Sequence, residues 1–374
     1  MDWIPLCKAD YGPEEEKEML YCLHLGRLEG DGSYTKKIHQ FFQETYGIKK
    51  ALFTTSCTDA LELSALLLDI KPGDEVIVPS YTFVSTAHAF ALRGAKILFA
   101  DSEIDNPNIS MESVKKLLSP RTKAVVPVHY AGFSCDMEQL MSLATKHQFI
   151  VIADAAQAID STYLNKPTVT WGHMSTLSFH QTKNISCGEG GLLAINDEKF
   201  AHRAEILREK GTNRSAFFRG EVDKYNCVDI GSSYLGSDLL ASILTAQIQK
   251  MPKIQQARHK IWHQYHESFQ ALRGKVQLPK ILSTGQHNAH CYFLVCKNLE
   301  ERTQLNQFLK DQKIGATFHY LSLHKSPYYG RTYTGADLPM ADRYTDCLLR
   351  LPLFPNMTAE EVTHVIHSLK KFFA

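Results

Sequence analysis

The sequence has no run of 18 or more apolar residues and no basic N-terminal segment followed by an apolar stretch. It therefore predicts neither a membrane-spanning helix nor a secretory signal. Its 41 Lys and Arg residues balance 40 Asp and Glu residues, so no overall charge attracts nucleic acid or an acidic membrane surface. We expect a cytoplasmic protein without nucleic-acid or membrane partners, in which local groups bind any anionic ligand.

Sequence signatures of metal and disulfide sites are also missing. The nine cysteines are scattered without a CxxC pair, which favours reduced thiols over a disulfide framework. The seventeen histidines include no HExxH motif or comparable ligand spacing, so no metal site is predicted.

The pattern along the chain predicts two domains. Between residues 49 and 196 short apolar runs alternate with helical patterns, and the runs at 49–55, 75–80, 122–128 and 149–153 are nearly continuous. Such runs are typical of strands buried on both faces of a mostly parallel sheet. After about residue 250 the pattern becomes a long helix, a strand, a helix, a second strand at 315–323 and a terminal helix from Thr358. We expect an α/β fold with a large domain at 1–250 and a smaller α+β domain at 251–374.

Asp154 follows an apolar strand and precedes Ala155, Ala156 and Gln157. A lone carboxylate at a strand end most often caps a helix or pairs with an arginine. The functional alternative is an anchor for a cationic ring nitrogen, because a nearby carboxylate favours the charged form of such a ring by about 1–3 pKa units. A ring kept protonated in this way is an electron sink.

Lys183 lies in the segment SFHQTKN, just past a strand and shortly before the turn GEGG. Most lysines are solvated surface charges. A lysine between a buried strand and a glycine turn can lose its hydration, which lowers its pKa and frees the amine for Schiff-base chemistry.

The turn TTSCT before the helix near Asp59 offers hydroxyls and free amides at a helix N-terminus, which is a favourable place for a phosphate. Ser56 or Thr58 can equally be a simple helix cap, and Ser178 can supply a further hydroxyl. In the segment PSYTF, Phe83 stands where a flat ring could stack or where an aromatic could pack in the core.

Together, SCT at 56–58, Phe83, DAAQ at 154–157 and SFHxxK at 178–183 followed by GEGG resemble the DegT/DnrJ/EryC1/StrS sugar aminotransferases, a branch of the fold type I pyridoxal-phosphate enzymes. Longer segments, among them GDEVIVPSYTFVSTA, REKGTNRSAFFRGEVDKY and LLRLPLF, are most similar to dTDP-4-amino-4,6-dideoxygalactose transaminases. The resemblance covers essentially the whole chain. It implies a large domain with a mostly parallel seven-stranded sheet flanked by helices, and a small C-terminal α+β domain.

The resemblance also implies roles for individual residues. Lys183 would be the catalytic residue and hold pyridoxal 5′-phosphate as a Schiff base, with Asp154 on the ring nitrogen, Gln157 on the ring hydroxyl and Phe83 stacked on the ring. The phosphate would be bound by Ser56, Cys57, Thr58 and Ser178. In relatives an asparagine from the neighbouring subunit reaches this phosphate; here Ser233 occupies its place and inherits the role. Residues expected at the sugar nucleotide are His180, Lys210, Asn213, Arg214, Arg219, His319 and Tyr320, although the basic ones can also be ordinary solvated side chains.

The implied reaction is transamination of dTDP-4-keto-6-deoxyglucose by L-glutamate to give dTDP-4-amino-4,6-dideoxygalactose for polysaccharide or lipopolysaccharide synthesis, in a homodimer with shared active sites. Alternatives are a C3 aminase, a transaminase that forms the 4-amino-4,6-dideoxyglucose product, a sugar dehydratase or a non-catalytic regulator that keeps the cofactor fold. Relatives that act as dehydratases typically have histidine in place of the lysine, so Lys183 argues against that activity.

Overall fold

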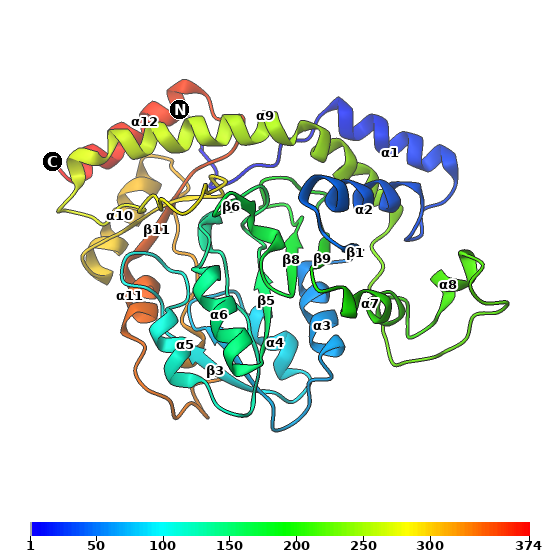
Figure 1. The fold of residues 1–374 in the computed structure, drawn as a ribbon. Coiled ribbons are helices and arrows are strands. Elements are labelled where there is room, and N and C mark those ends of the chain that lie inside the picture. The colour runs from blue at the N-terminus through cyan, green and yellow to red at the C-terminus, as the bar shows by residue number, and fades with distance from the viewer. Residues whose placement is uncertain (1) are drawn as a thin grey trace.

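The computed structural model describes residues 2–374, and its centre is a seven-stranded sheet (Figure 1). The strands are β1 (Lys50–Thr54), β2 (Glu75–Pro79), β3 (Lys96–Ala100), β4 (Thr122–Val125), β5 (Ile150–Asp154), β8 (Met174–Ser178) and β9 (Gly191–Ile195). Their spatial order is β1-β9-β8-β5-β4-β2-β3, and β9 alone runs antiparallel to its neighbours. The mostly parallel seven-stranded sheet expected from the sequence is confirmed.

Helices cover both faces of this sheet, which explains the continuous apolar runs of its strands. One face packs against α3 (Cys57–Leu67), α4 (Ser85–Ala91) and α7 (Ala201–Arg208). The other face packs against α5 (Met111–Leu117) and α6 (Met137–His147) over its centre, and against α2 (Ser33–Tyr46) and α9 (Asp238–Ser268) near β1 and β9. Val76, Ile77 and Val78 of β2 are fully buried because every side chain of the strand meets one of these layers.

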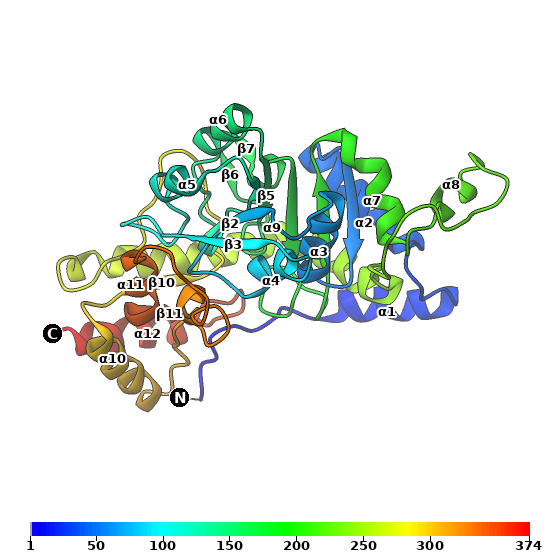
Figure 2. The same ribbon diagram turned by 90° about the horizontal axis from the view of Figure 1, so that it is seen from below.

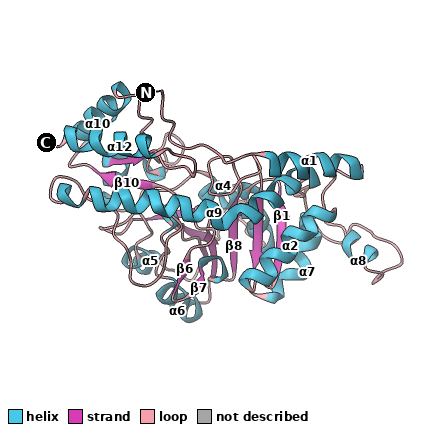
Figure 3. Cartoon of the chain, turned by 90° about the horizontal axis from the view of Figure 1, so that it is seen from above, coloured by secondary structure: helices cyan, strands magenta, loops and turns pink. Residues whose placement is uncertain are grey.

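A smaller layer follows helix α9. It contains the antiparallel pair β10 (Tyr292–Val295) and β11 (Leu348–Leu351) with α10 (Leu299–Asp311), α11 (Pro339–Cys347) and α12 (Ala359–Phe372). The terminal helix begins where it was expected, and Thr358 is its N-cap, since its side chain accepts a hydrogen bond from the Glu361 amide. Figure 3 shows the long helix α9 passing from the sheet to this layer. The predicted domain boundary at 250/251 therefore falls inside one continuous helix.

The strand expected at 315–323 is not formed, so this prediction was wrong. Only Thr317 forms a bridge there, with Arg350, and Leu323 already begins a short 3-10 helix (Leu323–Lys325). The two ends of the segment are bound to different partners: the Gly315 amide donates to the Ile4 carbonyl at 2.8 Å and the Leu323 amide donates to the Ser80 carbonyl at 2.9 Å. The segment therefore crosses from the small layer to the end of β2 instead of extending the small sheet.

The remaining elements lie outside these layers. They are the N-terminal α1 (Pro13–Leu25), the short pair β6 (Thr162–Tyr163) and β7 (Lys166–Pro167), and α8 (Arg214–Phe218). Residues 209–233, which carry α8, form an arm that projects from the body in two perpendicular views (Figures 1 and 2). An isolated antiparallel β-bridge between Glu209 and Ser233 joins the two ends of the arm. Among residues 2–374, no helix combines the length and the apolar character needed to cross a membrane.

Candidate active site

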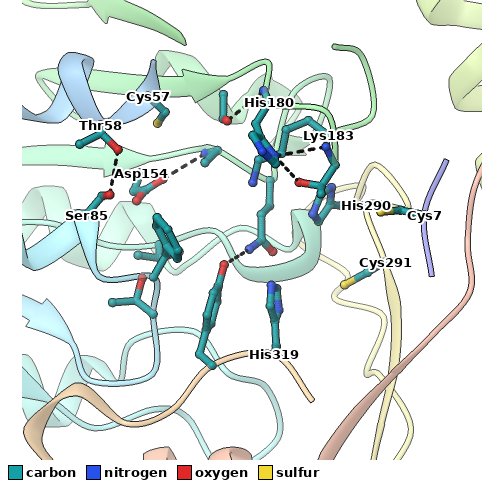
Figure 4. A pocket seen from close by; sticks show the side chains of 18 of the residues that line it. Cys7, Cys57, Thr58, Ser85, Asp154, His180, Lys183, His290, Cys291 and His319 are labelled. Carbon is teal, nitrogen blue, oxygen red and sulfur yellow. Dashed lines mark hydrogen bonds between the residues drawn. The ribbon is translucent and has the colours of Figure 1, made fainter. Parts of the chain in front are cut away.

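A cavity of about 590 Å³ opens at the carboxyl ends of the parallel strands. Its wall comes from the turns after β1, β2, β5 and β8 on one side and from the small layer on the other (Figure 4). This is the edge at which ligands bind in open α/β sheets. The sequence-predicted residues in its lining are Ser56, Cys57, Thr58, Phe83, Asp154, Gln157, Ser178, His180, Lys183, His319 and Tyr320.

Asp154 is the last residue of β5 and is almost completely buried. Its Oδ2 accepts a hydrogen bond from the Thr86 hydroxyl at 2.8 Å, and its Oδ1 accepts one from the Ala156 amide at 3.1 Å. Burial raises the pKa of this carboxyl, and these two hydrogen bonds and the more distant Lys183 oppose the rise. No cationic side chain of residues 2–374 pairs with it, so the carboxylate carries a buried charge that a bound cation would stabilise.

Lys183 lies in the loop between β8 and β9, where its amide donates to the His180 carbonyl at 2.9 Å. Its side chain faces the cavity (Figure 4). Burial lowers the pKa of this amine; the Arg350 guanidinium adds to the effect, while Asp154 opposes it. A lowered pKa leaves more of the amine neutral and nucleophilic.

The turn after β1 is built to receive an anion. Ser56 is the N-cap of α3 and accepts a hydrogen bond from the Asp59 amide at 3.0 Å, so the cap predicted from the sequence is present. The Thr58 and Ser85 hydroxyls lie 2.8 Å apart, and both line the cavity. The first amides of a helix have no partner within the helix, and they are therefore available to a phosphate.

Gly191 explains part of the glycine turn that the sequence highlighted. It begins β9, directly opposite Ser178 in the sheet. A Cβ atom at this position would lie 2.3 Å from the Ser56 carbonyl carbon and 2.4 Å from the Cys57 nitrogen. Only glycine lets β9 approach the anion-binding turn so closely.

Gln157 links the large domain to the segment 315–323, which we call the crossing segment. Its Oε1 accepts from the Ala131 amide at 2.7 Å, and its Nε2 donates to the Tyr320 hydroxyl at 2.7 Å. Tyr320 in turn stacks on His319, with 3.8 Å between the ring centroids. Phe83 is 56% exposed, so its ring is free to contact a ligand in the cavity instead of packing in the core.

The residues present fit pyridoxal phosphate. A buried carboxylate without a cationic partner suits a ring nitrogen that must carry a proton. A lysine with a lowered pKa faces the same cavity. The helix N-terminus beside Gly191 suits a phosphate.

Five predicted residues do not line the cavity of this chain. Ser233 is at the base of the arm, and Lys210, Asn213, Arg214 and Arg219 lie along it. Two of them form ion pairs near by: Arg214 with Glu209 at 2.9 Å, and Arg219 with Glu205 at 3.1 Å and Glu221 at 2.6 Å. Within one chain these side chains belong to a separate surface.

The structure also adds residues that were not predicted. Thr86 bonds Asp154, Tyr130 bonds the Nδ1 of His319 at 2.8 Å, and Arg350 lines the cavity from β11. Thr86 follows Phe83 by three residues, so helical spacing was an available signal. Arg350 had no such signal, because a charged residue in an apolar strand usually faces solvent.

Comparison with known proteins identifies the class of this site. The sequence model of the DegT/DnrJ/EryC1/StrS aminotransferase family matches residues 10–370. The chain belongs to this family. Membership confirms the family expected from the sequence, the fold type I architecture, the aminotransferase class and pyridoxal phosphate as the cofactor.

Relatives of this aminotransferase match it along nearly its whole length. The spore coat polysaccharide biosynthesis protein SpsC of Bacillus subtilis is 34% identical, and the match covers 98% of this chain and 96% of SpsC. The structure of PseC of Helicobacter pylori, an aminotransferase of pseudaminic acid biosynthesis, has a TM-score of 0.91 at 25% identity and covers 100% and 99% of the two chains. Spr1654 of Streptococcus pneumoniae, assigned as a sugar aminotransferase, is similar in its PMP form, with a TM-score of 0.91, 25% identity and coverage of 99% and 97%.

Proposed function

We propose that this aminotransferase transfers the amino group of L-glutamate to C4 of dTDP-4-keto-6-deoxyglucose and forms dTDP-4-amino-4,6-dideoxygalactose. The general activity, amination of a sugar, is supported by the family and by relatives named for polysaccharide and sugar biosynthesis. The particular sugar is supported by likeness of the segments GDEVIVPSYTFVSTA, REKGTNRSAFFRGEVDKY and LLRLPLF. The observation that carries the chemistry is a lysine and an unpaired buried carboxylate facing one cavity beside a helix N-terminus.

The residues divide the chemical work. Asp154 would hold a proton on the ring nitrogen through charge pairing, Gln157 would contact the ring hydroxyl, and Phe83 would pack on the ring face. The amides and hydroxyls of Ser56, Cys57, Thr58 and Ser178 would bind the phosphate. Bound pyridoxal phosphate supplies an electron sink for the carbon that loses its proton.

Lys183 moves the proton in each half-reaction. Its Nζ would accept the proton from the Cα of the amino donor and hold it, and with the sugar it would return a proton to the carbon that receives the amine. Its lowered pKa supports this role, because a neutral amine is the form that accepts a proton. Tyr320 and His319 form the wall toward which the sugar would lie.

We further propose a homodimer in which the arm completes the active site of the partner subunit. Lys210, Asn213, Arg214 and Arg219 would then bind the diphosphate, and Ser233 would reach the cofactor phosphate. Large exposed apolar side chains on the arm support burial against another chain, since Phe218, Tyr225 and Ile230 are 68%, 52% and 63% exposed.

Product analysis tests this proposal. Purified holoenzyme is incubated with dTDP-4-keto-6-deoxyglucose and L-glutamate, and the product is examined by mass spectrometry and proton NMR. We expect an amine at C4 with a small H3–H4 coupling, as in a galactose-configured ring. An amine at C3 or a large coupling would identify one of the alternative aminases. Turnover of the keto sugar without an amino acid would identify a dehydratase.

A further inference from the structure

Arg350 lines the cavity from strand β11, where its backbone is paired on both sides. Its backbone pairs with Phe293 of β10 on one side and with Thr317 on the other, where the Arg350 amide donates to the Thr317 carbonyl at 2.8 Å. Its Nη2 donates to the Phe318 carbonyl at 2.9 Å. The guanidinium is therefore held in place while the side chain lines the same cavity as Lys183.

The guanidinium has unused hydrogen-bonding capacity. Its Nε is buried and has no hydrogen-bond partner within residues 2–374. No Asp or Glu side chain in that range lies within ion-pair distance of it, whereas six of the other twelve arginines pair with a carboxylate. A buried donor without a partner is unfavourable, so an anionic ligand near the guanidinium would be stabilised by hydrogen bonds that the protein leaves unmade.

The position beside Lys183 selects the kind of anion. The Arg350 charge lowers the pKa of Lys183, which places the two groups in one local field. In an α-amino acid the carboxylate is bonded to the same carbon as the reacting amine. In a C4-keto sugar nucleotide the diphosphate is attached at C1, on the opposite side of the ring from the reacting carbon. A fixed cation close to the reacting lysine therefore suits the amino acid.

We propose that Arg350 binds the α-carboxylate of the amino donor, an inference that rests on the transaminase function proposed above. The planar guanidinium matches a carboxylate through two parallel hydrogen bonds, which a lysine cannot reproduce. The same contact orients the Cα–H bond toward Lys183. Arg350 is thus a specificity residue for the donor half-reaction and not for the sugar half-reaction.

The test separates the two half-reactions in the holoenzyme. L-glutamate is added at increasing concentration, without any sugar, to wild type, Arg350→Gln and Arg350→Lys. The visible absorbance of bound pyridoxal phosphate reports its conversion to the amine form. We expect the Kd for L-glutamate to rise about 10–100-fold in Arg350→Gln, the loss typical of a hydrogen bond to a charged group. Arg350→Lys should recover only part of it. Arg343→Gln, an exposed arginine on α11, is the matched control and should leave the Kd unchanged.

A second measurement assigns the contact to the α-carboxylate. Wild type should discriminate strongly against L-glutamate α-amide, whereas Arg350→Gln should bind the acid and the α-amide with similar affinity. The reverse half-reaction, from the amine form of the cofactor to the keto sugar, should proceed at the wild-type rate in Arg350→Gln.

Two results would overturn the proposal. If both half-reactions weaken equally, Arg350 only braces the segment with His319 and Tyr320 through the Phe318 carbonyl. If only the sugar half-reaction weakens, the guanidinium binds the diphosphate. A wild-type enzyme that reacts with no amino acid would instead contradict the proposed function itself, so the two failures are distinguishable.

Discussion

The cavity and the arm of this aminotransferase satisfy their charged groups in opposite ways. The cavity is lined by three charged residues, Asp154, Lys183 and Arg350. None of them has an oppositely charged side chain within ion-pair distance in the described chain. On the arm Arg214 pairs with Glu209, and Arg219 pairs with Glu221 and with Glu205 of α7. Charges left unpaired in a buried place indicate a bound ligand, whereas charges that are paired within the chain give no such indication.

A single chain places only part of the predicted residues in one cavity. The cavity brings together the residues expected at the cofactor, except Ser233. The arm keeps the residues expected at the diphosphate away from that cavity, together with exposed aromatic side chains. The first group should act within a single chain, and the second should act only when another chain is present. The following experiments test this division, beginning with the largest expected effect.

Replacing Lys183 with Ala should abolish transamination, with a loss of at least about 10³-fold, because it removes both the proton carrier and the covalent attachment of the cofactor. The visible absorbance of the purified variant and its rate with keto sugar and L-glutamate report the result. Lys280→Ala, an exposed lysine that does not line the cavity, is the comparison variant and should keep the wild-type rate. A variant that keeps the wild-type absorbance band and still aminates the sugar would refute the role of Lys183.

Replacing Asp154 with Asn should lower kcat by about 10–1000-fold, since a carboxylate favours the protonated ring by about 1–3 pKa units and an amide does not. The Thr86 hydroxyl can still bond the amide oxygen, so the fold should survive. Steady-state kinetics and cofactor content are measured, with Glu189→Gln as an exposed carboxylate control at the cavity edge. Equal kcat values for wild type and Asp154→Asn would remove the ring-nitrogen anchor from the mechanism.

The sequence predicted the cavity better than the arm for a physical reason. The carboxyl ends of parallel strands share one edge, so motifs at 56–58, 154–157 and 178–183 had to converge there. The prediction of a strand at 315–323 was wrong because the course of this segment depends on contacts to Ile4 and Ser80, which are distant in the sequence. Arg350 was missed for the same reason, since only the folded chain shows that its strand faces the cavity. For Ser233 and the basic arm residues we propose roles that need a second chain, and local sequence patterns do not describe contacts between chains.

Replacing Arg219 with Gln should sharpen the comparison by affecting only the proposed shared site. We expect the KM for the sugar nucleotide to rise about tenfold, the loss of roughly one charge-assisted hydrogen bond, while the L-glutamate half-reaction is unchanged. Lys280→Gln breaks another exposed ion pair and is the control. An unchanged KM would leave Arg219 as a surface residue, the alternative reading of the basic segment.

Acidification should produce the smallest effect, and it should weaken the body before the arm. Burial lowers the pKa of His129 and of His287 to about 3 in the folded chain. An unfolded histidine has a pKa of about 6.5, so between pH 6.5 and 3 the unfolded state binds more protons and stability falls as the pH falls. The arm carboxylates Glu221 and Asp229 have pKa values lowered by Arg219 and Arg203, so their ion pairs persist to a lower pH than those of ordinary carboxyl groups.

Urea unfolding at pH 6.5 and 5.0 measures this difference. Between the two pH values wild type should lose about 1.6 kcal/mol more of its unfolding free energy than His287→Gln, because the variant lacks one of the buried histidines that resist protonation. The exposed His202→Gln is the control and should follow wild type. Identical pH dependence in wild type and His287→Gln would show that His287 is protonated as readily in the folded chain as in the unfolded one, and its burial beside Trp262 would then carry no acid sensitivity.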